Sequence, residues 1–401
     1  MRKTLLVTLD FYPKIGGVAN YYFNLCQNLP QDKIVVLTEE QRDKNTTTQE
    51  HNNNRESAFN FRIIREQLMA RWCWPRWWPM IFKIGRISRK ETIERLWAGD
   101  IWPTGLAIYL ISIFWGRPYI ISVHGRDLLL AKKNKLKEFL VKIILKQAKT
   151  ITVNSQSTGR IAEGFGIGQE QTKVIYPGVG KQEDKNTGRQ EYKNKIIEKH
   201  NLVGKKILLS IGRLVERKGF DKVIEAMPKI GEKVEDLIYV IAGEGPDRER
   251  LEKITRRQEY TRPQRLAASD GGREKTRINV IFIGGVSENE KWAWLDLCDI
   301  FIMPARETKD DIEGFGIVYL EAAMAGKPVI AGKSGGASEA VIDGETGILV
   351  DPENHEEIAG AIIKLFNNKE LARKMGDNGK RRVEGEFDWA ILGKEMEEIL
   401  K

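Results

Sequence analysis

The chain contains few cysteines and few histidines, which removes several classes of protein from consideration. Of its 401 residues, three are cysteine and four are histidine. Cys26, Cys73 and Cys298 are widely separated and form no CxxC pair. The sequence therefore predicts neither a disulfide framework nor a zinc site, and it favours a reducing, cytoplasmic environment.

Long hydrophobic runs are also missing. The longest uncharged run, residues 101–116, contains Pro103 and is shorter than the ~20 residues needed to cross a bilayer. We expect a buried helix there. The first ten residues have a basic start but only a short apolar core, which Asp10 interrupts, so they predict a first strand rather than a signal peptide.

The composition is that of a soluble globular protein with more than one core. Hydrophobic residues make up 41% and charged residues 30%, and 401 residues exceed the usual size of one domain. The net charge is +9, from 65 basic and 56 acidic residues. This excess is compatible with a nucleotide sugar, a membrane surface or a nucleic acid as partner, and it does not choose among them.

Strand-like and helical patterns alternate along the chain, which predicts α/β domains with parallel sheets. The strand-like runs are residues 4–9, 33–37, 119–123, 150–153, 173–175, 206–211, 237–242, 280–283, 300–303 and 327–331. A charged, glycine-containing stretch at residues 180–202 separates two such series. We therefore expect one domain at residues 1–180 and a second at 203–385.

The segment 313–330 combines a glycine-rich turn with the start of a helix. Gly314 and Gly316 allow a close turn and leave backbone N–H groups free, and residues 315–325 have the composition of a buried helix. Residues 327–331 follow as a short buried strand. The helix N-terminus would then lie at the mouth of an α/β crevice, where its partial positive charge attracts phosphate.

Two carboxylates flank that helix start. Glu313 precedes the helix, and Glu321 is expected about two turns inside it, where it can face a ribose. A glutamate on a glycine-flanked helix is also common as a solvated side chain. The adjacent Asp310 and Asp311 are typical of a solvated loop, and no convincing D-x-D metal element is present.

Other polar residues follow predicted strands, at the edge where α/β sheets build their sites. Gly16 and Gly17 come after the first strand, His124 follows residues 119–123, and Arg213 and Lys218 follow residues 206–211. Each also has a structural explanation: a turn, a core histidine or solvated cations.

Two segments combine aromatic or aliphatic residues with cations. Residues 71–80 hold four of the ten tryptophans beside basic residues, and more cations follow up to residue 90. Residues 127–149 form a basic amphipathic pattern whose apolar stripe is most simply the face that packs on the sheet. Such segments suit a bilayer interface, but the tryptophans could equally fill a local core or cap an acceptor site.

These strings resemble known sequence elements. The segment 313–330 resembles the E-x7-E segment of glycosyltransferase family 4, whose members are retaining enzymes of the GT-B fold that use nucleotide-activated sugars. The G-R-x4-K-G string at 212–219, the H-G-x-D string at 124–127 and the glycine pair at 16–17 resemble other elements of that family. The likeness covers nearly the whole chain and is weakest at residues 39–95 and 255–276.

The resemblance implies a fold as well as an activity. The fold is GT-B, in which two Rossmann-like, doubly wound parallel-sheet domains face each other across a cleft. Residues 1–180 would bind the acceptor, and residues 203–385 would bind the nucleotide sugar. The final helix, about residues 386–401, would pack back on the first domain.

The resemblance also assigns roles to residues. It implies catalytic roles for His124, Glu313, Arg213 and Lys218. The implied donor-binding set comprises Gly16, Gly17, Arg213, Lys218, Glu313, Gly314, Phe315, Gly316, Ile317, Val318 and Glu321. In this scheme the cations and the helix start bind the diphosphate, Glu321 binds the ribose, and Glu313 and His124 contact the sugar. Because such a set can replace a metal ion, we expect no metal and no cofactor besides the donor.

Residues 10–17 and 312–323 resemble in particular the phosphatidylinositol mannosyltransferase-like branch. This favours GDP-mannose over a UDP-hexose as donor and a lipid-linked or glycan acceptor, with peripheral contact at the inner face of the cell membrane. Nucleic acid is not expected, since the basic stretch 255–276 contains only Tyr260 for base stacking. Two rivals remain: a nucleotide-sugar epimerase of the same fold, and a non-catalytic protein that binds a nucleotide sugar or a lipid.

Overall fold

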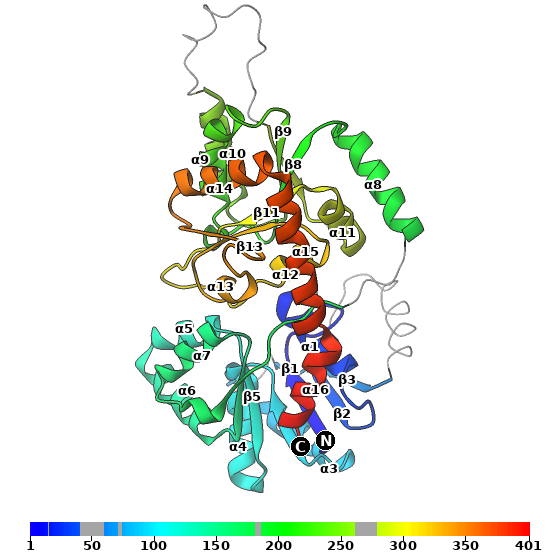
Figure 1. The fold of residues 1–401 in the computed structure, drawn as a ribbon. Coiled ribbons are helices and arrows are strands. Elements are labelled where there is room, and N and C mark those ends of the chain that lie inside the picture. Colours follow the sequence, from blue (N-terminus) through cyan, green and yellow to red (C-terminus); the bar gives the residue numbers. More distant parts are fainter. Residues whose placement is uncertain (15, 41–59, 71–73, 181–185, 261–278) are drawn as a thin grey trace, which may run out of the picture. The chain divides into compact units, whose positions relative to one another are not determined.

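The structure is a computed structural model that describes residues 1–14, 16–40, 60–70, 74–180, 186–260 and 279–401. The chain divides into two compact units (Figure 1). The N-terminal unit comprises Met1–Gly180 together with Phe387–Lys401, and the C-terminal unit comprises Lys181–Glu386. Most of the basic stretch 255–276, for which nucleic-acid binding was considered, lies outside the described residues.

The N-terminal unit is built on a seven-stranded sheet in the order β3-β2-β1-β4-β5-β6-β7, and all its pairs are parallel. Its strands are β1 (Thr4–Thr8), β2 (Ile34–Glu39), β3 (Arg62–Glu66), β4 (Arg95–Ala98), β5 (Tyr119–Val123), β6 (Thr150–Val153) and β7 (Thr172–Val174). The inner strands are buried on both faces, which is why they read as continuous apolar runs.

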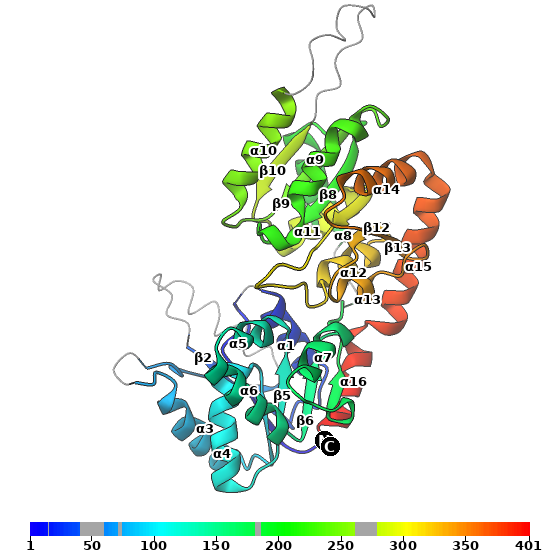
Figure 2. The same cartoon turned by 90° about the vertical axis from the view of Figure 1, so that its left-hand side faces the viewer.

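Helices cover both faces of this sheet. They are α1 (Gly17–Gln27), α3 (Trp78–Lys90), η1 (Ile101–Gly105), α4 (Leu106–Trp115), α5 (Arg126–Lys132), α6 (Lys135–Gln147), α7 (Gln156–Glu163), η2 (Gln169–Gln171) and α16 (Trp389–Ile399). Side chains alternate along β1, so Leu6 faces α1 and α16, whereas Leu5 and Val7 face α3, α4 and α6. Figure 1 shows α16 beside α1, and Figure 2 shows α3, α4 and α6 together.

The C-terminal unit has a six-stranded parallel sheet in the order β10-β9-β8-β11-β12-β13. Its strands are β8 (Lys206–Ile211), β9 (Leu237–Ala242), β10 (Val280–Gly284), β11 (Ile300–Met303), β12 (Val329–Gly332) and β13 (Gly347–Val350). Its helices are α8 (Asn186–His200), η3 (Glu216–Lys218), α9 (Phe220–Gly231), α10 (Arg248–Tyr260), α11 (Glu288–Leu297), α12 (Ile317–Met324), α13 (Ala337–Ala340), α14 (His355–Asn367) and α15 (Lys369–Glu386). The predicted class, α/β with two parallel sheets, is confirmed.

The sequence did not predict β3, β4 or β13. Edge strand β3 carries charged residues at both ends and is only half-buried. In β4, the buried Arg95 interrupts the apolar pattern, and its guanidinium donates to the carbonyl oxygen of Ile399 at 2.9 Å. Strand β13 is a short edge strand of four residues that pairs in parallel with β12.

The expectation of a buried helix at residues 101–116 is only partly correct. The run contains η1 followed by α4, and the first residues of α4 are buried. Near its end, however, Ile113 is 57% exposed and Phe114 is 81% exposed. Apolar side chains in water at this position require a different explanation from core packing.

Candidate active site

Both sheets reverse their strand order at one point, and the predicted site residues lie in loops or at helix starts near these points. The reversals occur between β1 and β4 and between β8 and β11. Open α/β sheets bind ligands in the crevice outside the carboxyl ends of their strands at such points. Each unit therefore has its own candidate binding region, and the two are described separately below.

In the C-terminal unit, Lys218 and Glu313 form a buried ion pair. Each is 8% exposed, and Lys218 Nζ lies 2.6 Å from Glu313 Oε2. Arg217 Nη1 donates to the same carboxylate oxygen. Burial alone would raise the pKa of Glu313, but the two cations outweigh it and the pKa lies below its ordinary value. Glu313 is thus an ionised carboxylate that two cations hold in one orientation.

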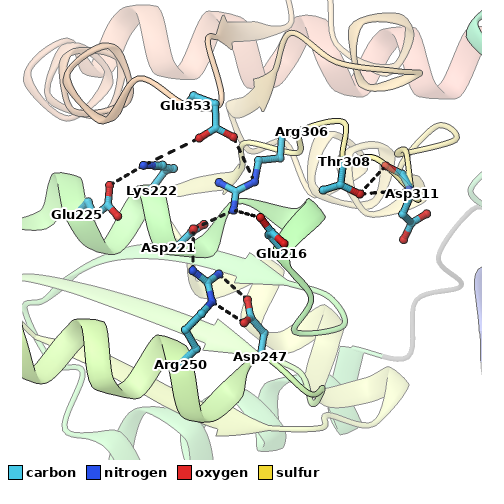
Figure 3. Close-up of polar contacts among 10 residues, drawn as sticks. All are labelled: Glu216, Asp221, Lys222, Glu225, Asp247, Arg250, Arg306, Thr308, Asp311 and Glu353. Carbon is cyan, nitrogen blue, oxygen red and sulfur yellow. Dashed lines mark hydrogen bonds and ion pairs between the residues drawn. The ribbon is translucent and has the colours of Figure 1, made fainter.

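The loop that carries Lys218 is tied to the loop after β11. The backbone N–H of Arg306 donates to the carbonyl oxygen of Arg217 at 2.8 Å, and Arg217 Nε donates to Asp311 Oδ2 at 2.9 Å. Thr308 Oγ1 accepts from the N–H of Asp311 at 3.1 Å (Figure 3). Asp311 lies in a loop, as the sequence predicted, but its carboxylate is only partly exposed and pairs with Arg217.

A charge network centred on the buried Arg306 and Asp221 supports these loops (Figure 3). Arg306 contacts Asp221 (Nη2 to Oδ2, 2.8 Å) and Glu353 (Nε to Oε1, 3.3 Å). Arg250 reaches the same oxygen of Asp221 at 3.2 Å and forms two bonds to Asp247, at 2.6 and 2.7 Å. The network joins α9, α10 and the loop after β11, so it fixes the backbone on which Lys218 lies.

The N-terminus of α12 is open to a ligand. Gly316 precedes the helix with φ at +90°, and a Cβ there would come within 2.4 Å of the ring of Tyr319, so the turn requires glycine. No side chain caps the helix. The amide groups of Ile317 and Val318 are among those that a helix start leaves without internal partners.

Other residues of the predicted donor-binding set lie in loops of the same unit. Phe315 is buried, and the carbonyl of Gly314 lies so close to Gly336 that a Cβ on Gly336 would come within 2.1 Å of it. Arg213, directly after β8, is exposed, and its side chain has no hydrogen-bond or ion-pair partner within the described part of the chain. Its positive charge is free for an anion.

Glu321 forms a second charged pair. Its Oε1 lies 2.6 Å from Lys291 Nζ, which also contacts Glu288 at 2.9 Å. Burial raises the pKa of Glu321, and Lys291 opposes that shift. Because α12 begins at Ile317, Glu321 lies little more than one turn inside the helix, not the expected two turns.

In the N-terminal unit, the predicted glycines open helix α1. Gly16 is the residue before the helix and Gly17 is its first residue, and no side chain caps this start. Gly16 has an extended backbone, and a Cβ there would meet no atom within 4 Å. The space beside Gly16 is therefore open in this unit.

His124 lies at the end of β5 and is bonded to α1. Its Nε2 lies 2.8 Å from the hydroxyl of Tyr22, which in turn donates to the carbonyl oxygen of Gly99 at 2.6 Å. Burial lowers the pKa of His124 to about 4, so the imidazole is neutral at pH 7. A neutral imidazole can orient a sugar hydroxyl but cannot neutralise a phosphate.

Three acidic residues act electrostatically on His124 or on its partner Tyr22. They are Asp10, Asp100 and Asp127. Burial raises the pKa of Asp100 to about 7 and that of Asp127 to about 6. This part of the N-terminal unit is thus acidic and partly protonated near neutral pH, whereas the candidate residues of the C-terminal unit include cations.

Sequence reasoning missed three residues that the structure brings into contact with the predicted set. Arg217 stands inside the string that supplied Arg213 and Lys218, so its basic character was a usable signal. Lys291 lies 30 residues from Glu321, and no local pattern connects them. Tyr22 belongs to an apolar helical stripe and was indistinguishable from a core residue.

Two features are absent from the described residues. No group of three or more His, Cys, Asp or Glu side chains there could hold a metal ion. Within the same residues, no helix has both the length and the apolar character needed to cross a bilayer.

Comparison with known families gives matches in both units. Residues 15–183 match the model described as Glycosyltransferase Family 4, and residues 205–368 match the model described as Glycosyl transferases group 1. The two matches meet near the boundary between the units.

Individual proteins match over most of the chain. A GDP-mannose-dependent alpha-(1-6)-phosphatidylinositol monomannoside mannosyltransferase of Mycobacterium tuberculosis is 28% identical over 403 residues, covering 100% of this chain and 98% of that protein. The alpha-1,3/1,6-mannosyltransferase ALG2 of Dictyostelium discoideum is 30% identical and covers 74% and 73%. Among solved structures, Anabaena HepE in complex with UDP and glucose has a TM-score of 0.74 at 19% identity, covering 100% and 99%.

Proposed function

Because this chain belongs to glycosyltransferase family 4 and has the GT-B fold, we propose that it transfers a mannosyl group from GDP-mannose to a hydroxyl group of a glycolipid. We further propose that the anomeric configuration is retained and that no metal ion takes part. The observation that carries the proposal is the set of cations in the C-terminal unit: Lys218, paired with Glu313 just before α12, and the exposed Arg213, whose side chain has no partner among the described residues.

The donor would bind to the C-terminal unit. Departure of a nucleoside diphosphate leaves negative charge on a phosphate oxygen, and placed cations and backbone N–H groups stabilise it. Arg213, Lys218 and the amides of Ile317 and Val318 supply these groups. We propose that these groups stabilise the leaving diphosphate without a metal ion.

The neighbouring carboxylates would bind the sugar and the ribose of the donor. Glu313 is ionised and fixed by its cations, so it can accept hydrogen bonds from sugar hydroxyls while its position stays constant. Glu321, beside Lys291, would accept bonds from the ribose hydroxyls. His124 of the N-terminal unit would contribute a neutral contact to the sugar.

GDP-mannose is proposed as donor because of the relatives. The mycobacterial relative is named as GDP-mannose-dependent, and the Dictyostelium relative is named as a mannosyltransferase. The name of the mycobacterial protein also supplies the acceptor class, since phosphatidylinositol monomannoside is a glycolipid. Both assignments are transferred here as a proposal.

An exposed aromatic face on the N-terminal unit supports a lipid acceptor. Trp78, Phe82 and Arg89 lie on one face of α3, at positions separated by four and seven residues. The guanidinium of Arg89 lies 5.0 Å from the ring centre of Trp115 at the end of α4, next to the exposed Phe114. Rings beside cations at a surface are typical of a membrane interface.

The basic helix α6 carries further exposed apolar side chains. As expected from the sequence, Val141, Ile144 and Leu145 are buried against the unit. Leu136 and Phe139, however, are exposed among lysines, so the apolar stripe does not end at the core. We propose that α3, the end of α4 and the start of α6 contact the inner face of the cell membrane.

A donor and acceptor screen tests the whole proposal. The purified protein is incubated with radiolabelled GDP-mannose or UDP-glucose, with and without a phosphatidylinositol mannoside extract. We expect mannose label in the lipid phase and an equal amount of free GDP, both only when the extract is present. NMR of the product should show that C1 keeps the configuration of the donor. Nucleotide release without acceptor, or label from UDP-glucose alone, would contradict the proposal.

Replacing exposed rings tests the membrane contact separately. The double variant Phe82→Gln/Phe114→Gln should bind vesicles of phosphatidylinositol and phosphatidylcholine about tenfold more weakly, because each ring loses part of the ~2 kcal/mol that burial of an aromatic side chain provides. Co-sedimentation measures the change. Val203→Gln, at an exposed apolar position of the C-terminal unit, is the matched control and should bind normally. Equal binding by all three proteins would exclude this surface.

A further inference from the structure

His124 is held between two tyrosines of α1 that contact it differently. The ring centres of Tyr21 and Tyr22 both lie 5.5 Å from that of His124, and both rings are nearly perpendicular to it, at 83° and 80°. The hydroxyl of Tyr21 points elsewhere and donates to the carbonyl oxygen of Ile175 at 3.2 Å. Only the Tyr22 hydroxyl contacts the imidazole.

The position of the protons follows from the partners of Tyr22. The carbonyl oxygen of Gly99, 2.6 Å from the Tyr22 hydroxyl, can only accept, so the single hydroxyl proton is directed to it. The hydroxyl also has a side-chain hydrogen bond with Ser122. Because its own proton goes to Gly99, its 2.8 Å contact with His124 Nε2 needs a proton from the imidazole. His124 must carry its proton on Nε2, and the neutral ring leaves Nδ1 as an acceptor.

We propose that Tyr22 is a positioning residue: it holds His124 as the Nε2–H tautomer and so makes Nδ1 an acceptor for a hydroxyl group of the transferred sugar. This inference rests on the proposed function for the sugar, but the tautomer itself does not. Within the described part of the chain, Nδ1 has no hydrogen-bond partner, so a ligand hydroxyl can occupy it.

The surroundings favour a neutral, hydroxyl-bearing ligand at this nitrogen. Asp10 acts electrostatically on His124, and Asp100 and Asp127 act on Tyr22. Negative groups in this position repel phosphate. An imidazolium would donate from both nitrogens and could not accept, but burial keeps the pKa of His124 near 4 and thus the ring neutral at pH 7.

Nitrogen NMR on the protein labelled with 15N-histidine reads the tautomer directly. The chain has four histidines, and the signals of His124 are those lost in His124→Gln. In the wild type, we expect Nε2 to be protonated and Nδ1 to be unprotonated. Tyr22→Phe removes the hydrogen bond to His124 Nε2, so we expect a mixture of the two tautomers in this variant.

The same variants are compared in the transferase assay. Tyr22→Phe should lower kcat/KM for GDP-mannose by about tenfold, the effect of losing one neutral hydrogen bond. Tyr21→Phe removes a hydroxyl from the adjacent position of the same helix and retains the ring contact with His124. It should leave both the tautomer and kcat/KM unchanged.

The outcomes separate this inference from the proposed function. A protonated Nδ1 in the wild type, or the same tautomer in Tyr22→Phe as in the wild type, would overturn the role of Tyr22 even if the enzyme is active. A shifted tautomer with unchanged kcat/KM would overturn the sugar contact. A wild-type protein that transfers no mannose would overturn the proposed function and with it the sugar contact, whereas the NMR result would still decide whether Tyr22 sets the tautomer.

Discussion

Replacing Lys218 with methionine should lower kcat/KM for GDP-mannose by about 10³-fold, the usual effect of removing a group that stabilises developing charge. Lys218 is the buried cation of the candidate site, and its Nζ lies 2.6 Å from Glu313 Oε2. Methionine keeps most of the side-chain volume and removes the charge. The loss should appear mainly in kcat, since charge on the leaving diphosphate develops in the transition state.

Loss of the cation would also affect folding, and this effect must be separated from catalysis. Removing one partner of a buried ion pair costs about 3 kcal/mol, because the remaining charge is left buried. Arg217 still contacts Glu313, so the variant should remain folded at 25 °C but unfold at a lower denaturant concentration. Urea titration followed by circular dichroism measures the difference.

A second substitution distinguishes the two effects. The double variant Lys218→Met/Glu313→Gln replaces the pair with neutral groups, while Arg217 keeps its 2.9 Å contact with Asp311. We expect its stability to return to within about 1 kcal/mol of the wild type, whereas activity stays lost. Recovery of activity together with stability would mean that Lys218 serves the fold alone.

Lys222 provides a matched control for the single change. It lies in the first turn of α9 and pairs with Glu225 at 2.9 Å and Glu353 at 3.9 Å (Figure 3). Ion pairs at a partly exposed position contribute about 0–1 kcal/mol, so Lys222→Met should be as active and nearly as stable as the wild type. Similar losses in both variants would argue for a general effect of charge.

The sequence predicted which candidate residues lie in loops directly after strands. The loops that hold Gly16, His124, Lys218 and Glu313 each follow a strand, and parallel strands bring their carboxyl ends to one edge of a sheet. A strand pattern and a polar loop were enough to place them. The sequence gives no comparable signal for Lys291, because its link to Glu321 depends on how α11 and α12 pack.

Strands were predictable where helices cover both faces of the sheet. The strands at residues 119–123, 150–153, 237–242 and 300–303 have the expected bounds, because strands covered on both faces are apolar throughout. Strand β4 was missed because it buries an arginine, Arg95, whose hydrogen bond to the carbonyl oxygen of Ile399 joins residues 304 positions apart in the sequence. No local pattern contains that contact.

The charge of a buried carboxylate also depends on neighbours that a sequence does not reveal. Glu313 and Glu321 look alike in the sequence, eight residues apart in one segment. Two cations lower the pKa of Glu313 despite its burial, whereas one cation fails to offset burial at Glu321, whose pKa is raised. The two glutamates should therefore respond differently to pH.

Glu321→Gln should raise KM for GDP-mannose about 100-fold and change kcat less. In the proposed complex, the carboxylate accepts hydrogen bonds from two ribose hydroxyls, and charge-assisted bonds contribute about 1.5–3 kcal/mol each. The ribose does not react, so these bonds are present in both the bound donor and the transition state, and their loss affects KM. Initial rates over a range of donor concentrations measure both constants.

A donor without ribose hydroxyls makes this prediction specific. For the wild type, 2′,3′-dideoxy-GDP-mannose should show a KM raised to the same extent as the substitution produces. For Glu321→Gln, the deoxy donor and GDP-mannose should have similar KM values, because the interaction is already absent. Additive losses would show that Glu321 does not contact the ribose.

Glu288→Gln is the matched control, because it removes the other carboxylate that contacts Lys291. Glu288 lies 2.9 Å from Lys291 Nζ and is 65% exposed at its side chain, whereas Glu321 is buried. Loss of this exposed partner should leave KM within about twofold of the wild type. A large increase in KM would indicate that Lys291, rather than Glu321, determines donor affinity.

The pH dependence gives an independent check of the same assignment. A carboxylate whose pKa is raised begins to take up a proton at a higher pH than an ordinary glutamate, whose pKa is about 4.3. As the pH falls toward the raised pKa of Glu321, the protonated group loses acceptor capacity and KM of the wild type should rise. In Glu321→Gln this acidic increase should be absent, because glutamine does not titrate. If both proteins show the same acidic increase in KM, the titrating group lies elsewhere, and Glu321 does not hold the donor through its charge.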